Sequence, residues 1–406
     1  MVLGLLLARA GVAVTVLEKH ADFLRDFRGD TVHASTLTLL DELGLGERFA
    51  ALPQRRIERG QVAVGGTLRT VADLSRLPGA HQHIALVPQW DFLELLASAA
   101  AEESGFTLRR NAEVTRLVFD RGRVVGVGYR DRAAGTKHEL HAALVVGCDG
   151  RDSTVRAAAG LPPRTFGAPI DVEWFRLPRV DGDPHGLGGW AAERQLMVMI
   201  DRGDYWQCGY IVGKGEDAPL RAAGIEAFRG RLAGLVPWLG NRADAVASFD
   251  DVKLLEVRLE RLRRWYLDGL LLIGDAAHAM SPVGGVGINL AVQDAVAAAR
   301  MLGPVLRAGS AVTVGHLRAV QRRRARPAAL IQAGQRVAHA VLAGPRAAQA
   351  GLPPAPSGAG FSTDLPLPIR LLTRFPVLQG IPARVVAIGP RPEHAPRWAR
   401  RPSRIR

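Results

Sequence analysis

Cysteine is scarce in this sequence, with Cys148 and Cys208 the only two among 406 residues. So few thiols exclude a disulfide framework and favour a reducing compartment. The 11 histidines are scattered rather than grouped with cysteines at metal-ligand spacing, so no metal site is predicted. No apolar run reaches the roughly 18–20 residues that span a membrane. The apolar segment Val2–Ala8 is short and no basic residue precedes it, unlike a signal peptide. We therefore expect a cytoplasmic protein without a membrane span.

Acidic residues are outnumbered, since 53 Lys and Arg against 39 Asp and Glu give a net charge of +14. Nine arginines fall between Arg370 and Arg406, and a second cluster spans Arg322–Arg326. No aromatic residues alternate with the basic ones and no zinc-finger spacing is present, so no specific nucleic-acid binding is predicted. A solvated, arginine-rich surface is the simpler interpretation. Peripheral contact with an anionic membrane through the basic C-terminus is the alternative.

The chain begins with a predicted helix followed by a strand. Residues 1–11 fit a helix that ends at Gly11, and Val12–Leu17 is a run of β-branched and apolar residues closed by Glu18. This order is typical of the second half of a dinucleotide-binding βαβ unit, whose acidic residue accepts hydrogen bonds from a ribose. Taken alone, Glu18 could equally be a plain strand-end charge. The glycine-rich loop of such a unit lies about 20 residues earlier. We therefore expect a strand and Gly-x-Gly-x-x-Gly before Met1.

The stretch Gly269–Leu302 organises the rest of the chain. It reads as a buried strand ending in Gly274-Asp275, a glycine-studded loop and a helix from about Gly287. This combination favours an anionic ligand, because the free N–H groups and the dipole of a helix N-terminus attract negative charge. An ordinary strand-to-helix turn is the alternative. A second predicted strand, Ala143–Cys148, also ends in a carboxylate beside a glycine.

Residues 162–252 follow a different pattern, in which helical periodicity fades and alternating strands appear. An antiparallel sheet with aromatic residues suits a wall that covers a ligand. The alternative is a half-buried sheet that packs on the first domain. The aromatic residues concerned are Trp174, Phe175, Tyr205, Trp206 and Tyr210.

Two motifs resemble the fingerprints of a known family, the group A flavoprotein monooxygenases related to p-hydroxybenzoate hydroxylase. The first is the glycine–aspartate motif Gly274–His278 with its following Pro282, and the second is the aspartate–glycine motif Cys148–Arg156. The resemblance implies an α/β protein with an FAD-binding, Rossmann-like domain of the glutathione-reductase type, at 1–161 and 253–330. It further implies an antiparallel β-sheet substrate domain at 162–252. A helical, Arg- and Pro-rich segment at 331–406 would follow.

The resemblance implies one group of cofactor-contacting residues in the first part of the chain. Glu18 would bind the ribose, and Val114 would contact the adenine through its backbone. Arg28 resembles the family's flavin-contacting arginine, and Gln89 the cofactor-contacting residue at a helix start. Asp149 would link the FAD site to NAD(P)H binding.

A second implied group surrounds the flavin ring. Gly274 and Asp275 would hold the ribityl and pyrophosphate region, and Pro282 would lie beside the flavin on the substrate side. No residue is certain to be catalytic, because the flavin carries the chemistry. We expect His278 to be a packing residue rather than a base. Backbone N–H groups on the O2 edge of the ring would come from Gly285, Gly287, Ile288 and Asn289.

The implied function is an NAD(P)H-dependent FAD monooxygenase that hydroxylates an aromatic, apolar or polyketide-like small molecule with O₂, through a flavin C4a-hydroperoxide. A flavin-dependent reductase or dehydrogenase on the same fold is the alternative. The departure from the family is the glycine-rich loop that cradles the FAD diphosphate, which these 406 residues lack. We therefore expect residues 1–406 alone to bind FAD weakly or not at all.

Overall fold

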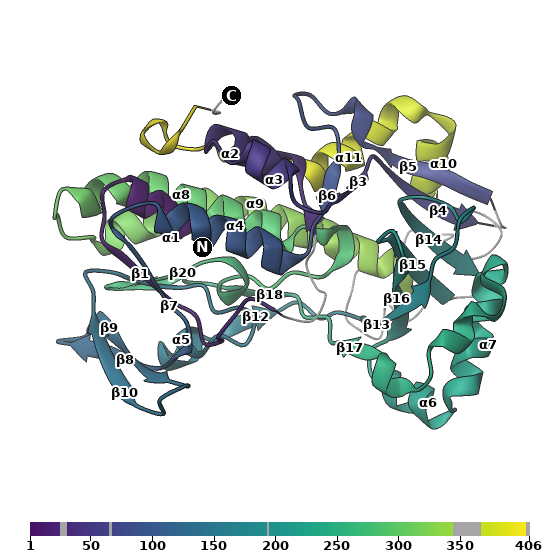
Figure 1. The fold of residues 1–406 in the computed structure, drawn as a ribbon, viewed down its shortest axis with the longest axis horizontal. Coiled ribbons are helices and arrows are strands. Elements are labelled where there is room, and N and C mark those ends of the chain that lie inside the picture. Colours follow the sequence, from purple (N-terminus) through teal and green to yellow (C-terminus); the bar gives the residue numbers. More distant parts are fainter. Residues whose placement is uncertain (25–30, 65–66, 193–194, 344–366, 403–406) are drawn as a thin grey trace.

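The computed structural model describes residues 1–24, 31–64, 67–192, 195–343 and 367–402. Two regions lie side by side (Figure 1): long helices with short parallel strands on one side, and a seven-stranded sheet with its own helices on the other. The predicted α/β class, with an antiparallel sheet and C-terminal helices, is confirmed.

Two parallel pairs of short strands lie in separate small sheets, and a third parallel pair belongs to the large sheet described below. β1 (Val14–Leu17) pairs with β7 (Phe106–Arg109), and β11 (Val145–Gly147) pairs with β20 (Leu270–Leu272), which is also antiparallel to β19 (Tyr266–Leu267). The three leucines of β20 are fully buried, as expected for a parallel strand covered on both faces. Among the described residues β1 pairs only with β7, and β11 only with β20, so each keeps one unpaired edge.

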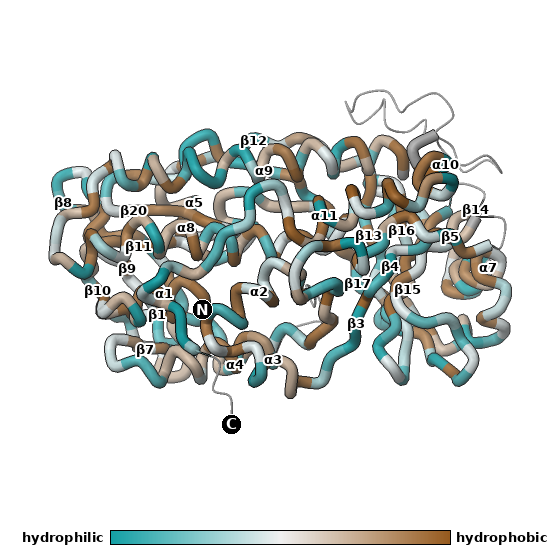
Figure 2. The backbone as a smooth tube through the Cα atoms, turned by 90° about the horizontal axis from the view of Figure 1, so that it is seen from above, coloured by the Kyte–Doolittle hydropathy of each residue, from teal (hydrophilic) through white to brown (hydrophobic). Residues whose placement is uncertain are grey.

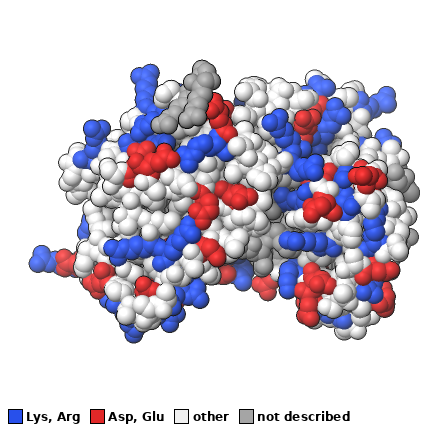
Figure 3. Space-filling model, in the orientation of Figure 1, with Lys and Arg blue, Asp and Glu red and all other residues white. Residues whose placement is uncertain are grey.

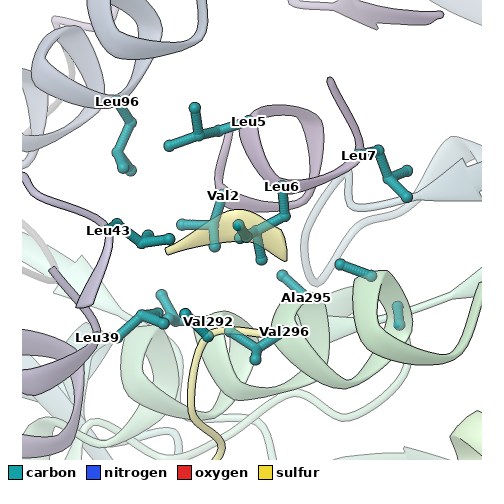
Figure 4. Packing of buried hydrophobic residues seen from close by; sticks show 14 of the residues in the cluster. Val2, Leu5, Leu6, Leu7, Leu39, Leu43, Leu96, Val292, Ala295 and Val296 are labelled. Carbon is teal, nitrogen blue, oxygen red and sulfur yellow. The ribbon is translucent and has the colours of Figure 1, made fainter. Parts of the chain in front are cut away.

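The first helix, α1 (Val2–Arg9), packs into the centre of the largest core. Figure 4 shows its leucines between α2 (Ala34–Glu42), α4 (Gln89–Ala101) and α8 (Gly287–Arg307). Leu5 and Leu6 are fully buried, and each such side chain stabilises the fold by about 1.5–3 kcal/mol. Gly11 follows with φ +79°, the left-handed residue that commonly ends a helix. The predicted helix end is confirmed.

A three-stranded antiparallel meander covers one end of the parallel strands. It consists of β8 (Ala112–Asp120), β9 (Arg123–Asp131) and β10 (Lys137–His141), in the order β10-β9-β8. The turn between β8 and β9 places Arg121 and Gly122 at φ +46° and +82°. Two consecutive positive φ angles are what a two-residue hairpin turn of type I′ requires, and Arg121 and Gly122 supply them.

The large sheet has the strand order β17-β13-β16-β15-β14-β4-β5. Residues 59–73 supply two of its strands and residues 253–255 a third, in addition to the four from the expected range 162–252. Helices α6 (Asp217–Ala222) and α7 (Ile225–Leu235) cover its outer face, and the other face turns toward the region that contains α8 (Figure 1). The strands are β4 (Arg59–Val64), β5 (Thr67–Asp73), β13 (Ile170–Pro178), β14 (Leu187–Ala192), β15 (Gln195–Asp201), β16 (Tyr205–Gly213) and β17 (Lys253–Leu255).

The predicted aromatic ligand wall is wrong for three of its residues. Phe175, Trp206 and Tyr210 are buried in a core under α7 and the following turn, on the face away from α8. Trp174, which alternates with Phe175, lies on the opposite face. A Cβ added to Gly209 would come within 3.2 Å of its ring. The residue pattern predicted that these segments are strands. The register of the strands decides which face of the sheet each aromatic side chain takes.

Two long helices run beside the small sheets. Figure 2 shows α8 in the middle of the molecule, with α9 (Val314–Ala343) and β12 (Pro163–Thr165) along one edge. α9 continues through Pro327. The remaining elements are α3 (Gly46–Ala50), β2 (Thr31–Val32), β3 (Arg55–Ile57), η1 (Leu74–Arg76), β6 (Ile84–Leu86), α5 (Thr154–Ala158), η2 (Pro237–Ala245), η3 (Phe249–Asp251), β18 (Glu260–Leu262), η4 (Gly274–Ala276), η5 (Val283–Gly285), α10 (Leu367–Arg374), η7 (Pro376–Gln379), α11 (Gly380–Ala387) and η8 (Arg397–Ala399).

Part of the arginine excess is used inside the fold. The carboxylate of Glu393 is buried and accepts hydrogen bonds from Nε and Nη2 of Arg323 at 2.6 and 2.7 Å. Arg9 donates to the backbone oxygen of Ala399 at 3.0 Å. The C-terminal segment is thus held against α9 and α1 as far as it is described. Figure 3 shows other basic side chains interspersed with acidic ones over the visible face. Within the described ranges, no helix is long and apolar enough to cross a membrane.

Candidate flavin site

The turn after β20 is organised by one buried carboxylate, Asp294 of α8. Its oxygens accept hydrogen bonds from the backbone N–H of Gly274 at 3.1 Å, from Nε2 of His278 at 2.6 Å and from Nε of Arg324 at 2.9 Å. Burial raises the pKa of Asp294, but the charges and hydrogen bonds of His278 and Arg324 outweigh it and lower this pKa below its ordinary value. His278 therefore fixes the turn instead of facing a ligand, as expected for a packing residue.

Asp275 is the carboxylate that the turn leaves partly open. About a third of its side chain is exposed, at 32%, and one oxygen lies 3.9 Å from Nη2 of Arg151. Burial raises the pKa of Asp275, and the charge of Arg151 partly opposes that shift. A Cβ added to Gly287 would lie 4.0 Å from Oδ1 of Asp275. The carboxylate thus lies at the N-terminus of α8, which has no side-chain cap.

The glycine loop before α8 requires its glycines. Gly284 and Gly285 have φ +82° and +63°, a region that side chains rarely adopt. The hydroxyl of Thr31 donates to the backbone oxygen of Gly285 at 3.0 Å, and a Cβ on Gly285 would come within 2.7 Å of that hydroxyl. Pro282, half-buried, opens the loop. The backbone is therefore free to approach a flat ligand closely.

Helix α9 holds this loop from behind, a contact that the sequence did not reveal. The amide of Gln335 donates to the backbone oxygens of Ser281 and Val283, both at 2.9 Å. One turn further, Nε2 of His339 lies 2.7 Å from the hydroxyl of Ser281. Burial lowers the pKa of His339 to about 4, so the ring is neutral. Two polar residues four positions apart on a buried helix face were the available signal.

The side chain of Asn289 is used within the protein. Its oxygen accepts hydrogen bonds from the hydroxyls of Ser35 and Thr36, at 2.9 and 2.6 Å, which ties α8 to α2. Ile288 is half-buried against the same core. These bonds leave the backbone N–H groups at the start of α8 as the part of this segment that can serve a ligand. The family resemblance implies this role for Gly287, Ile288 and Asn289.

Glu18 and the strand that contains Val114 meet at the end of β1. Glu18 is half-buried there, and its backbone oxygen accepts from the N–H of Ala112 at 2.8 Å. This bond places the start of β8, which includes Val114, beside Glu18. Gln89 is the first residue of α4, where a helix start was predicted. Arg28 lies outside the described residues.

Asp149 caps a short helix. Its two oxygens accept from the hydroxyl of Ser153 at 2.5 Å and from the backbone N–H of Val155 at 2.9 Å, which fixes the start of α5. Arg156 of that helix donates to the backbone oxygen of Ala276 at 3.2 Å. The two predicted fingerprints are therefore in direct contact, through Arg156 as well as through the Arg151–Asp275 pair. Within the described part of the chain, no group of three His, Cys, Asp or Glu residues could hold a metal ion.

The sequence model of the FAD binding domain family matches residues 1–334. The chain belongs to this family of flavin monooxygenases. It is 34% identical to 6-methylpretetramide 4-monooxygenase of Streptomyces rimosus over 325 residues, 76% of this chain and 73% of the relative. It is 32% identical to 12-dehydrotetracycline 5-monooxygenase/anhydrotetracycline 6-monooxygenase of the same species, over 76% of this chain but only 62% of that relative.

A solved structure agrees with the predicted fold. OxyS anhydrotetracycline hydroxylase from Streptomyces rimosus superposes with a TM-score of 0.72 and 25% identity, over 95% of this chain and 73% of that chain. The family prediction is confirmed, and with it the p-hydroxybenzoate hydroxylase-like fold. For several curated relatives, the matched part of the chain spans less than two thirds of their length.

FAD fits one end of this site better than the other. At the ring end the glycine loop, the uncapped start of α8 and Asp275 form a cradle that a Cβ at Gly285 would disturb. At the diphosphate end, residues 1–24 contain only Gly4 and Gly11, so no Gly-x-Gly-x-x-Gly is present there. The residues that are present would hold the ring and ribityl portion, with Glu18 as an acceptor for the ribose.

Proposed function

We propose that the protein is an FAD-dependent monooxygenase that hydroxylates an aromatic or polyketide-like small molecule, with O₂ and with NADH or NADPH as the electron donor. The arrangement of Asp275 at the uncapped N-terminus of α8, beside a positive-φ glycine loop, carries the proposal. The names of the relatives support the substrate class, because the two described above act on tetracycline-type polyketides.

FAD, when bound, supplies the redox chemistry and the activation of oxygen. The backbone N–H groups at the start of α8, with the positive end of its dipole, would stabilise negative charge on the pyrimidine edge of the flavin. Asp275 would accept hydrogen bonds from ribityl hydroxyls, which lets a partly desolvated carboxylate recover the partners it lacks. Gln335 and His339 would keep the Pro282 loop in position while FAD is bound.

The inner face of the large sheet supports an apolar, planar substrate. Val172, Trp174 and Ile211 pack together on this face, which turns toward the region of α8. The indole N–H of Trp174 is buried and has no hydrogen-bond partner. Protein atoms close off this N–H, so the half-buried indole ring, and not its N–H, would pack on an apolar substrate. Trp174, rather than the buried Trp206, is therefore the proposed aromatic contact of the substrate.

We also propose that the protein works in the cytoplasm. Both cysteines are free thiols, Cys148 exposed and Cys208 buried. Free thiols persist in a reducing compartment. Fractionation of cells that express the protein tests this location, and recovery of the protein outside the cytoplasmic fraction would contradict it.

The proposal is tested by replacing Asp275. Asp275→Ala should lower flavin occupancy by about tenfold or more, because a charge-assisted hydrogen bond contributes about 1.5–3 kcal/mol. Occupancy is read from the visible flavin absorbance of protein that has been equilibrated with added FAD. Asp120→Ala, which removes an exposed carboxylate at the far end of β8, is the matched control. Equal occupancy in both variants would contradict the assignment.

A second measurement separates the monooxygenase from a reductase on the same fold. The flavin-loaded protein is given NADH or NADPH with a panel of phenols and polyketides under ¹⁸O₂. Incorporation of one labelled oxygen into a product supports hydroxylation. Reduction of a substrate without oxygen incorporation would favour the reductase or dehydrogenase instead.

A further inference from the structure

A cleft of about 380 Å³ lies between the two-stranded ladder of β12 with β18 and the helix α9. Figure 2 shows β12 and α9 next to each other along one edge of the molecule. The lining of the cleft contains four guanidinium groups and no Asp or Glu. It is separate from Asp275 and from the glycine loop, neither of which lines it. The four arginines are Arg164, Arg261, Arg263 and Arg326.

The strand register brings two of these charges together. Arg164 of β12 is directly opposite Arg261 of β18 in the antiparallel ladder. Like charges directly opposite each other destabilise a strand pair. Both guanidinium carbons lie over the ring of Phe166, at 5.1 and 4.9 Å from its centre. The aromatic ring offsets part of the repulsion and fixes both side chains in place, but it adds no negative charge.

Hydrogen bonds through Gln332 also orient Arg261. Its Nη1 donates to Oε1 of Gln332 at 3.1 Å, and the amide nitrogen of Gln332 donates to the backbone oxygen of Ala279 at 3.1 Å. Burial, together with the charge of Arg164, lowers the pKa of Arg261. A half-buried guanidinium beside a second one, with no carboxylate in the cleft lining, is a positive site without its counter-charge.

We propose that this cleft binds a phosphate-bearing small molecule through a diphosphate-like group. Planar guanidinium groups hold phosphate oxygens by paired, charge-assisted hydrogen bonds, and arginine is favoured over lysine for this task. Two sources share this chemistry. One is the dinucleotide electron donor, an identification that rests on the proposed function. The other is a free polyphosphate, which would bind whether or not the protein is a monooxygenase.

The test is a calorimetric titration of the full chain with inorganic pyrophosphate at about 0.1 M salt, where charges beyond roughly 10 Å are screened. The variant removes two exposed cleft arginines that take no part in the Phe166 contact, as Arg263→Gln with Arg326→Gln. Pyrophosphate affinity should fall by about tenfold or more. The control is Arg231→Gln, which removes one exposed charge from α7 on the far side of the large sheet and should leave the affinity unchanged.

The outcomes separate the two sources. Competition of NADPH with pyrophosphate, lost in the double variant, supports the cleft and identifies the dinucleotide. Binding of pyrophosphate without competition by NADPH supports the cleft and favours a free polyphosphate. No binding of pyrophosphate, or equal weakening by Arg231→Gln, overturns the proposal. An unchanged melting temperature shows that the double variant is folded, and Arg164→Gln provides a second variant if it is not. Because pyrophosphate binding is measured without reference to flavin, a failure of the proposed function leaves this result interpretable.

Discussion

The two ends of the candidate flavin site are built differently. At the ring end, Asp294, Gln335 and Asn289 each bond two or three groups of neighbouring elements, so the turn, the loop and the helix start are locked by the protein itself. At the adenosine end, Glu18 follows a four-residue strand that has one unpaired edge among the described strands. The ring end is therefore locked by side chains from several elements before any ligand binds, whereas the adenosine end is held mainly by backbone hydrogen bonds of Glu18 to Arg109 and Ala112.

Replacing Asp294 should break the locked end and have the largest effect. Asp294→Asn leaves the buried Arg324 with Glu393, 3.7 Å away, as its remaining counter-charge, and removing one partner of a buried ion pair costs about 3–5 kcal/mol. Urea unfolding at pH 7 measures this loss. Because the folded state lowers the pKa of Asp294, its stabilisation is complete above the unfolded pKa of about 4 and is lost as the pH falls through the folded value.

The pH dependence supplies the control for this variant. The difference in unfolding free energy between the wild type and Asp294→Asn should shrink as the pH falls below about 4. Asp268→Asn, which removes an exposed partner of Arg123, should cost about 1 kcal/mol or less. A similar loss in both variants would mean that the buried network does not lock the turn.

His339 stabilises the ring end through its contact with Ser281, and this stabilisation depends on pH. Burial lowers its pKa to about 4, so between about pH 6.5 and 4 the unfolded chain binds a proton that the folded chain excludes. Stability should therefore fall as the pH drops through this window, by up to about 3 kcal/mol from this residue. His339→Gln should flatten the dependence in urea unfolding measured at several pH values.

The matched control is His138→Gln, because His138 is exposed on β10. It should leave the slope between pH 6.5 and 4 unchanged. Some slope should remain in His339→Gln, since burial also lowers the pKa of His33. An identical profile in the wild type and His339→Gln would show that His339 is not the titrating group.

The ring end was also the part that the sequence predicted best. Gly274, Asp275 and the start of α8 at Gly287 lie in one short stretch of the chain, so a local pattern of strand, glycine and helix sufficed to place them. The contacts that lock them were not predictable. Gln335 reaches Ser281 across 54 positions of the chain, and a distance of that kind depends on how α9 packs rather than on any local motif.

The large sheet shows the same limit. Its strands followed from alternation, but the side that each aromatic residue takes depends on which face α7 covers. Trp206 and Trp174 carry the same side chain, yet one is in the core and the other faces the site region. The arginine pair across β12 and β18 likewise exists only through the strand register.

An added amino-terminal segment should strengthen FAD binding at the adenosine end. The amine of Met1 interacts with the charges of both Glu18 and Cys148, so the start of α1 lies near the ends of β1 and β11. An added amino-terminal strand that ends in Gly-x-Gly-x-x-Gly could pair with an open strand edge and direct backbone N–H groups at a diphosphate. FAD affinity, measured by flavin fluorescence quenching, should rise on the order of a hundredfold.

The control for this extension keeps its length and replaces its glycines with valines. Valine retains the strand propensity but prevents the close backbone approach that a phosphate requires. The valine version should restore stability without the gain in affinity. Equal FAD affinity with and without the glycine extension would show that the ring end alone determines binding.

Glu18→Gln should have the smallest effect, because it changes a single contact at the less rigid end. The substitution keeps the size of the side chain and one acceptor oxygen but removes the charge, and a charge-assisted hydrogen bond exceeds a neutral one by about 1 kcal/mol. FAD affinity should fall about fivefold, and riboflavin 5′-phosphate affinity should not change, because that ligand has no adenosine ribose. Equal losses for both ligands would place Glu18 near the flavin ring instead. A larger loss for FAD in the glycine-extended protein than in residues 1–406 would show that Glu18 contributes fully only once the adenosine end is held in place.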